Sequence, residues 1–121
     1  DMDMVAGTVR FSGLINNGQS CVAQTRILVP RENQDRFVEA LVADIQSLAI
    51  GDPRKIETFI GPLVSQRQRG RVVGYIEAGI AEGATLAVGG PGMPEGIDQG
   101  AFVRPTVFAN VENSMKIAQE E

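Results

Sequence analysis

The sequence predicts an α/β protein in which helices and strands form an αβα layered arrangement around a largely parallel sheet. Hydrophobic stripes with helical spacing alternate along the chain with short β-branched runs, and most connections between them are long. The length of 121 residues and the hydrophobic content of 43% fit a single globular domain. We therefore expect one layered domain over residues 1–121, without an internal repeat.

The first half of the chain predicts a helix, a strand and a second helix. Asp3 is expected to cap a helix that carries an imperfect hydrophobic stripe over residues 4–15 and ends in the Asn-Asn-Gly run at 16–18. A β-branched run at 26–30, closed by Pro30, predicts a buried strand. Hydrophobic residues recur at helical spacing over 37–48 and predict the clearest amphipathic helix, which Gly51 ends.

The second half predicts a loop, a third helix and two further strands. Residues 51–62 are rich in turn formers, and Ser65 is expected to cap a helix that Gly83 ends. Residues 85–88 predict a short strand, and the glycine-rich segment 89–100 an exposed loop. Residues 102–108 predict another strand, which Pro105 places at a sheet edge or a bend. Residues 115–121 begin an element that the chain does not finish.

Composition excludes several classes of function. The chain has no histidine, so it cannot build a Cys-His dyad, a Ser-His dyad or a histidine metal site by itself. Its single cysteine cannot form an internal disulfide, which favours a reducing, cytoplasmic setting. Eleven basic residues against fifteen acidic ones, without a basic run, argue against nucleic-acid binding. The sequence contains no segment long and apolar enough to span a membrane.

Cys21 is the one strongly nucleophilic side chain. It follows a polar, glycine-containing run where a helix should give way to a turn, and such a place offers exposure, small neighbours and backbone N–H groups for an oxyanion. The alternative is a buried cysteine that packs as a small hydrophobic residue.

The segment around this cysteine resembles the signature of NAD(P)-dependent aldehyde dehydrogenases, in which N-x-G-Q-x-C precedes a small residue and an arginine. Here residues 16–26 read NNGQSCVAQTR. Other segments resemble the family's landmarks in the family's order: GDP at 51–53, GPLV at 61–64, GYI at 74–76, EGA at 82–84, GG at 89–90, FVRPTVF at 102–108 and KIAQEE at 116–121. The resemblance implies part of an aldehyde dehydrogenase catalytic domain.

The resemblance also implies roles for individual residues. Cys21 corresponds to the nucleophile, whose thiolate attacks the aldehyde and whose backbone N–H supplies half of the oxyanion hole. Ser20 and Val22 correspond to positions that line the aldehyde tunnel. Glu121 and Gln68 correspond to positions that reach the ribose of the cofactor, which would be NAD or NADP. Asn16, Gly18 and Gln19 are expected to shape the turn that presents the thiol.

Gln68, the arginines near it and the glycine-rich loop each allow a structural interpretation without a bound ligand. Gln68 can equally be the third-position partner of a capping box with Ser65. The arginines at 67, 69 and 71 are expected to form a solvated helix face. No helix is predicted after the glycine-rich run that begins at Gly89, and no Lys-Ser/Thr pair follows it. We therefore do not interpret this run as a phosphate-binding loop.

Parts of the family's machinery are not found in these residues. The family's mechanism also uses a glutamate in an E-L-G-G-like segment and an asparagine that completes the oxyanion hole, and this sequence contains neither motif. The nucleotide-binding and oligomerisation regions are likewise absent. We therefore expect a fragment that, alone, neither oxidises an aldehyde nor binds NAD, from a parent that forms a homo-oligomer.

Two other functions stay open at this point. One is a CoA-acylating dehydrogenase of the same superfamily, in which a CoA thiol resolves the thioester. The other is a non-catalytic domain with a buried structural Cys21. The aldehyde used, and the choice between NAD and NADP, are not encoded in these residues.

Overall fold

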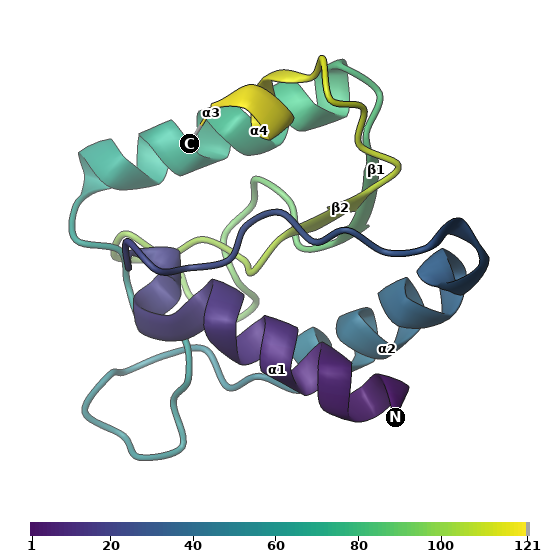
Figure 1. The fold of residues 1–121 in the computed structure, drawn as a ribbon. Coiled ribbons are helices and arrows are strands. Elements are labelled where there is room, and N and C mark those ends of the chain that lie inside the picture. The colour runs from purple at the N-terminus through teal and green to yellow at the C-terminus, as the bar shows by residue number, and fades with distance from the viewer. Residues whose placement is uncertain (121) are drawn as a thin grey trace.

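The computed structural model describes residues 1–120, which form two layers of helices with a small sheet between them (Figure 1). In chain order the elements are α1 (Met2–Leu14), η1 (Ile15–Gly18), η2 (Arg31–Asn33), α2 (Gln34–Gln46), α3 (Gln66–Ala81), β1 (Thr85–Val88), β2 (Val107–Ala109) and α4 (Lys116–Gln119). In this view α1 and α2 lie below, while α3 and α4 lie above.

Helix α1 begins earlier than the sequence predicts. The Asp1 carboxylate accepts the backbone N–H of Asp3 at 3.2 Å, which makes Asp1 the N-cap. The expectation that Asp3 caps this helix is therefore wrong. Asp3 lies in the first turn, where its charge is still favourable because the N-terminal end of a helix carries a partial positive charge.

The main core lies between α1 and α2. Ala6 of α1 packs against three buried side chains spaced one turn apart on α2, namely Phe37, Leu41 and Ile45. This confirms the amphipathic helix that the hydrophobic spacing predicts, with bounds at 34–46. At the edge of this core, the Arg10 guanidinium donates to Asp44 at 2.9 Å.

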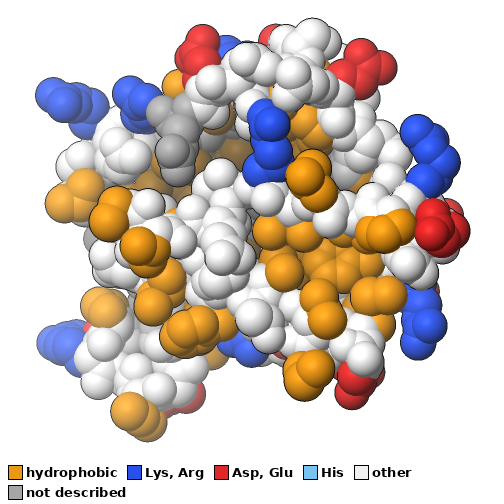
Figure 2. Space-filling model, viewed as in Figure 1, with side chains coloured by type: hydrophobic (Ala, Val, Ile, Leu, Met, Phe, Trp, Pro, Cys, Tyr) orange, Lys and Arg blue, Asp and Glu red, His pale blue; other side chains and the backbone are white. Residues whose placement is uncertain are grey.

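The segment 26–30 is extended but is not a strand, so that prediction needs correction. Ile27 and Val29 pack against the α1–α2 core, whereas Leu28 is 89% exposed. Side chains therefore alternate as in a strand, but within residues 1–120 no neighbouring strand pairs with this backbone. Hydrophobic side chains remain visible on this face of the molecule, between α3 and α1 (Figure 2).

The sheet in the described residues is antiparallel and has two strands. Thr85 of β1 pairs with Ala109 of β2, and a bulge separates this register from the Val88–Val107 pair. The expected parallel sheet is therefore not found in residues 1–120, because the long loop after β1 returns the chain beside the same strand.

The second strand is also shorter than predicted. Pairing starts at Val107, not at Phe102, because Pro105 has no N–H to donate. Before this strand, the backbone of Pro105 and Thr106 approaches Gly89 closely. Gly89 has a φ of +89°, and a Cβ there would lie 2.2 Å from the Pro105 carbonyl oxygen.

Helix α3 starts where predicted. Ser65 is its N-cap, and the Ser65 hydroxyl accepts the Gln68 N–H at 3.1 Å. At the other end, the Glu82 carboxylate accepts the Lys116 N–H at 2.7 Å, which ties α4 to the end of α3. Residues 51–62 form the predicted loop, closed by a single bridge between Ile50 and Ile60.

Candidate active site

The turn before Cys21 has an unusual backbone. Asn16, Asn17 and Gly18 all have left-handed φ angles, of 52°, 58° and 73°. Asparagine and glycine tolerate this region better than other residues, which explains the Asn-Asn-Gly run. The turn is closed by the Gln19 N–H, which donates to the Asn16 carbonyl at 3.0 Å.

Cys21 lies on the tip of a second turn and is exposed. The Ala23 N–H donates to the Ser20 carbonyl at 2.9 Å, so the chain reverses around the cysteine. Within residues 1–120, the Cys21 N–H donates to no protein acceptor. Val22 is 72% exposed and Ser20 is half-buried. The cysteine is therefore accessible, and its N–H is not used within the protein in the described residues.

Two side chains of the cysteine turn hold a distant segment of the chain. Asn17 accepts the Gly61 N–H through Oδ1 at 2.8 Å and donates through Nδ2 to the Pro62 carbonyl at 3.2 Å. Gln19 accepts the Val64 N–H through Oε1 at 3.0 Å. Sequence reasoning missed the Asn17 contact, because nothing in the spacing links residues 44 positions apart.

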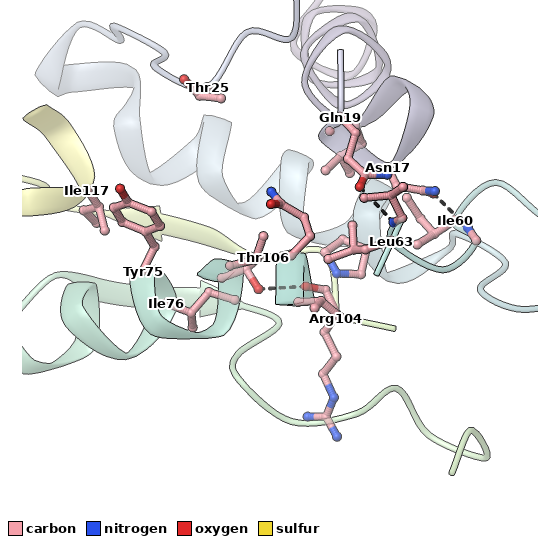
Figure 3. A pocket seen from close by; sticks show the side chains of 18 of the residues that line it. Asn17, Gln19, Thr25, Ile60, Leu63, Tyr75, Ile76, Arg104, Thr106 and Ile117 are labelled. Carbon is pink, nitrogen blue, oxygen red and sulfur yellow. Dashed lines mark hydrogen bonds between the residues drawn. The ribbon is translucent and has the colours of Figure 1, made fainter. Parts of the chain in front are cut away.

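A cavity of about 570 Å³ lies next to this turn (Figure 3). Its walls come from the cysteine turn, the 60–64 segment, α3 and the chain around β2. Most of the wall is apolar, with polar groups from Gln19, Gln68, Tyr75 and Thr106. Its volume lies within the range of small-molecule sites.

Gln68 takes part in the N-cap of α3 through its main chain, and in residues 1–120 its side chain makes no return hydrogen bond to the Ser65 N–H, so the capping box is only half formed. Its backbone N–H is bound by Ser65, while its side chain lines the cavity. The cap thus uses the main chain of Gln68 and leaves the side-chain amide available to a ligand. Glu121, the other residue expected to reach a cofactor, lies outside the described residues.

Arg26 joins the strand-like segment after the cysteine to the end of the chain. Its guanidinium donates to the Asn113 side chain at 3.2 Å and to the Ala118 carbonyl. Sequence reasoning noted Arg26 in the cysteine signature and in the predicted strand, but missed these contacts, because its partners lie about ninety residues away. The contact ties the segment that follows the cysteine turn to the α4 region.

The arginines of α3 do not form a uniformly solvated face, which corrects the prediction for this series. Arg69 is half-buried and donates through Nε to the Phe102 carbonyl at 2.8 Å. The Arg71 guanidinium lies 5.5 Å from the centre of the Tyr75 ring. Arg67 is exposed, as predicted.

Residues 1–120 contain neither a metal-binding cluster nor a membrane-spanning helix. No group of three histidine, cysteine, aspartate or glutamate side chains is placed to hold a metal ion. None of the helices in this part of the chain has the length and hydrophobicity that crossing a bilayer requires.

The sequence of the chain as a whole matches one known protein family. The Aldehyde dehydrogenase family matches residues 1–121, and the chain belongs to this family. A protein of Staphylococcus haemolyticus that bears the family's name is 46% identical over the whole chain. The chain spans 26% of that relative's length, so it corresponds to about a quarter of such a protein.

Solved structures of aldehyde dehydrogenases resemble this chain in both sequence and fold. An aldehyde dehydrogenase of Mycobacterium tuberculosis, complexed with NAD+, is 50% identical and superimposes with a TM-score of 0.94. A mutant of aldehyde dehydrogenase C from Pseudomonas syringae, in complex with NAD+ and octanal, is 39% identical with a TM-score of 0.96. Both alignments cover all of this chain and 25% of the other, and they support an α/β fold.

Proposed function

We propose that this chain is the nucleophile-bearing segment of an aldehyde dehydrogenase, which oxidises an aldehyde to a carboxylic acid with NAD or NADP. The observation that carries the proposal is the exposed Cys21 on the tip of its turn. The cavity that Gln68 lines reaches this turn at Asn17, Gly18 and Gln19, and Cys21 itself is not among its lining residues. Two aligned relatives were solved with NAD+, and one of them also with octanal. These ligands indicate the cofactor and the substrate class.

The chemistry requires a nucleophile that adds to a carbonyl and later leaves. The Cys21 thiolate attacks the aldehyde carbon, which gives a thiohemiacetal whose oxyanion the Cys21 N–H can stabilise. The bound nicotinamide supplies the hydride acceptor. Once the hydride has left, Cys21 carries a thioester, and attack by water releases the acid and restores the thiol. Sulfur suits both steps because a thiolate is a strong nucleophile and a good leaving group.

Gln68 fits the cofactor through its amide. The side chain lines the cavity, and an amide can donate to or accept from a ribose hydroxyl. Glu121 is proposed as a second ribose ligand, and Ser20 and Val22 as walls of the aldehyde site, since they flank the thiol in sequence.

The rest of the proposal concerns the full-length protein. It includes the layered domain with a largely parallel sheet, a cytoplasmic location and a homo-oligomeric state. In that sheet, a strand from another part of the protein would pair with the extended segment 26–30.

The proposal is tested with the full-length enzyme, NAD and octanal. We expect NADH formation in the wild type and a loss of at least roughly a thousandfold in Cys21→Ala and Cys21→Ser. Iodoacetamide should label and inactivate the wild type at Cys21, because this thiol is exposed.

Two results would contradict the proposal. A Cys21→Ala enzyme with the wild-type rate excludes the nucleophile assignment. A strict requirement for CoA identifies the acylating branch of the superfamily and excludes resolution of the thioester by water.

A further inference from the structure

We propose that Asn17 is a positioning residue, whose side-chain amide holds the cysteine turn in register with the start of α3. The inference rests on the proposed function, in which Cys21 attacks the aldehyde and Gln68 contacts the cofactor. Asn17 itself touches neither ligand in this proposal. It acts through the backbone of residues 61–62.

Both ends of the Asn17 amide are used. Oδ1 accepts the Gly61 N–H at 2.8 Å, and Nδ2 donates to the Pro62 carbonyl at 3.2 Å. An asparagine amide that bonds a donor and an acceptor on neighbouring residues can adopt only one orientation. Gly61 is buried, so if the Asn17 side chain were removed, water would not readily replace it as the acceptor for the Gly61 N–H.

A second contact prevents the turn from pivoting about Asn17. Gln19, two residues closer to the cysteine, accepts the Val64 N–H at 3.0 Å. Asn17 and Gln19 therefore hold the 61–64 segment at both of its ends, and Figure 3 shows both side chains pointing toward it.

The segment that they hold runs directly into α3. Val64 is followed by Ser65, the N-cap, and Gln68 lies in the first turn of the helix. Cys21, the proposed nucleophile, lies four residues after Asn17. The Asn17 contact thus connects the cysteine turn with Gln68, whose side chain is proposed to face the cofactor. The separation between thiol and cofactor depends on this connection.

The backbone of the turn cannot supply the same constraint. Its closing hydrogen bond joins Gln19 to Asn16 and stays within the turn. Such a bond fixes the shape of the turn but not its position relative to α3. Rates of chemical steps are sensitive to this position, since a displacement of about 1 Å can cost roughly a hundredfold.

The experiment compares three variants of the full-length enzyme. Asn17→Gly removes the amide but tolerates the left-handed φ of 58°. Asn17→Asp keeps the acceptor for Gly61 and loses the donor to Pro62. Asn33→Ala is the matched control, because Asn33 is exposed and its side chain makes no capping hydrogen bond to α2.

We expect both Asn17 variants to lower kcat by about tenfold or more and to raise the KM for NAD, while Asn33→Ala stays at the wild-type values. Alkylation of Cys21 by iodoacetamide should stay within about twofold of the wild-type rate, because a small reagent needs only an exposed thiol. A lower kcat together with an unchanged alkylation rate would show that the thiol is still reactive but is misplaced relative to the cofactor.

The inference is overturned if kcat per folded enzyme is unchanged in both Asn17 variants, even if their melting temperatures fall. That result would assign Asn17 a purely structural role. A wild type that does not oxidise aldehydes, or an active Cys21→Ala, would instead contradict the proposed function.

Discussion

The Ser65 hydroxyl accepts the backbone N–H of Gln68 at 3.1 Å, and this leaves the Gln68 side chain to the cavity. One residue therefore serves two roles through different atoms. The main chain completes the helix cap, and the amide is the group that we propose for the cofactor.

This division predicts different effects for two substitutions in the full-length enzyme. Ser65→Ala should lower the free energy of unfolding by about 1 kcal/mol, the usual cost of a lost N-cap. Gln68→Ala should raise the KM for NAD several-fold and leave the melting temperature unchanged. If Gln68→Ala lowers the melting temperature as Ser65→Ala does, with an unchanged KM, its side chain belongs to the cap alone.

Gly89 is predicted to tolerate no side chain. A Cβ there would lie 2.2 Å from the Pro105 carbonyl oxygen, and the φ of +89° is unfavourable for other residues. We expect Gly89→Ala to destabilise the protein by about 3 kcal/mol in urea unfolding. The matched control is Gly74→Ala in α3, where a Cβ meets no atom within 4 Å and should stabilise the helix by about 0.5–1 kcal/mol. Equal effects of the two substitutions would refute the close approach at Gly89.

Asp52 is predicted to titrate at unusually low pH. A side-chain hydrogen bond from Arg54, with Nη2 2.7 Å from Oδ2, is the main reason why the pKa of Asp52 falls from 3.8 to about 2. Because the pKa is lowered on folding, its contribution to stability is present above pH 3.8 and is lost as the pH falls from 3.8 to about 2.

The test is a carboxyl NMR titration of Asp52. Arg54→Ala should return the pKa of Asp52 toward 3.8, whereas Lys55→Ala should change it much less, since Lys55 acts only through a weak charge interaction. An unchanged pKa in Arg54→Ala would show that the hydrogen bond does not form in solution.

Local pattern predicted most of the helices. The spacing of Phe37, Leu41 and Ile45 identified α2, and the serine at 65 identified the start of α3. Such signals succeed because a helix is stabilised by side chains three and four positions apart, which the sequence displays directly. The N-cap of α1 was misplaced because Asp1 and Asp3 are both acceptable caps in sequence.

The strands were harder to predict. Segment 26–30 has the composition of a strand, but a strand is defined by its hydrogen-bonded neighbour, and none pairs with it within residues 1–120. Likewise the alternating elements and their long connections suggested a largely parallel sheet, yet β2 returns antiparallel to β1. Pairing partners and strand direction are long-range properties that periodicity does not encode.

The sequence by itself determined the family and the identity of the candidate nucleophile, because both depend on short runs of residues such as the segment around Cys21. Only the tertiary structure decided that the thiol is exposed, that Asn17 binds Gly61 and that Gln68 faces the cavity. The hydrogen bonds of the cysteine turn, for example, join residues more than forty positions apart. Such contacts form only after the helices have packed, so no local pattern predicts them.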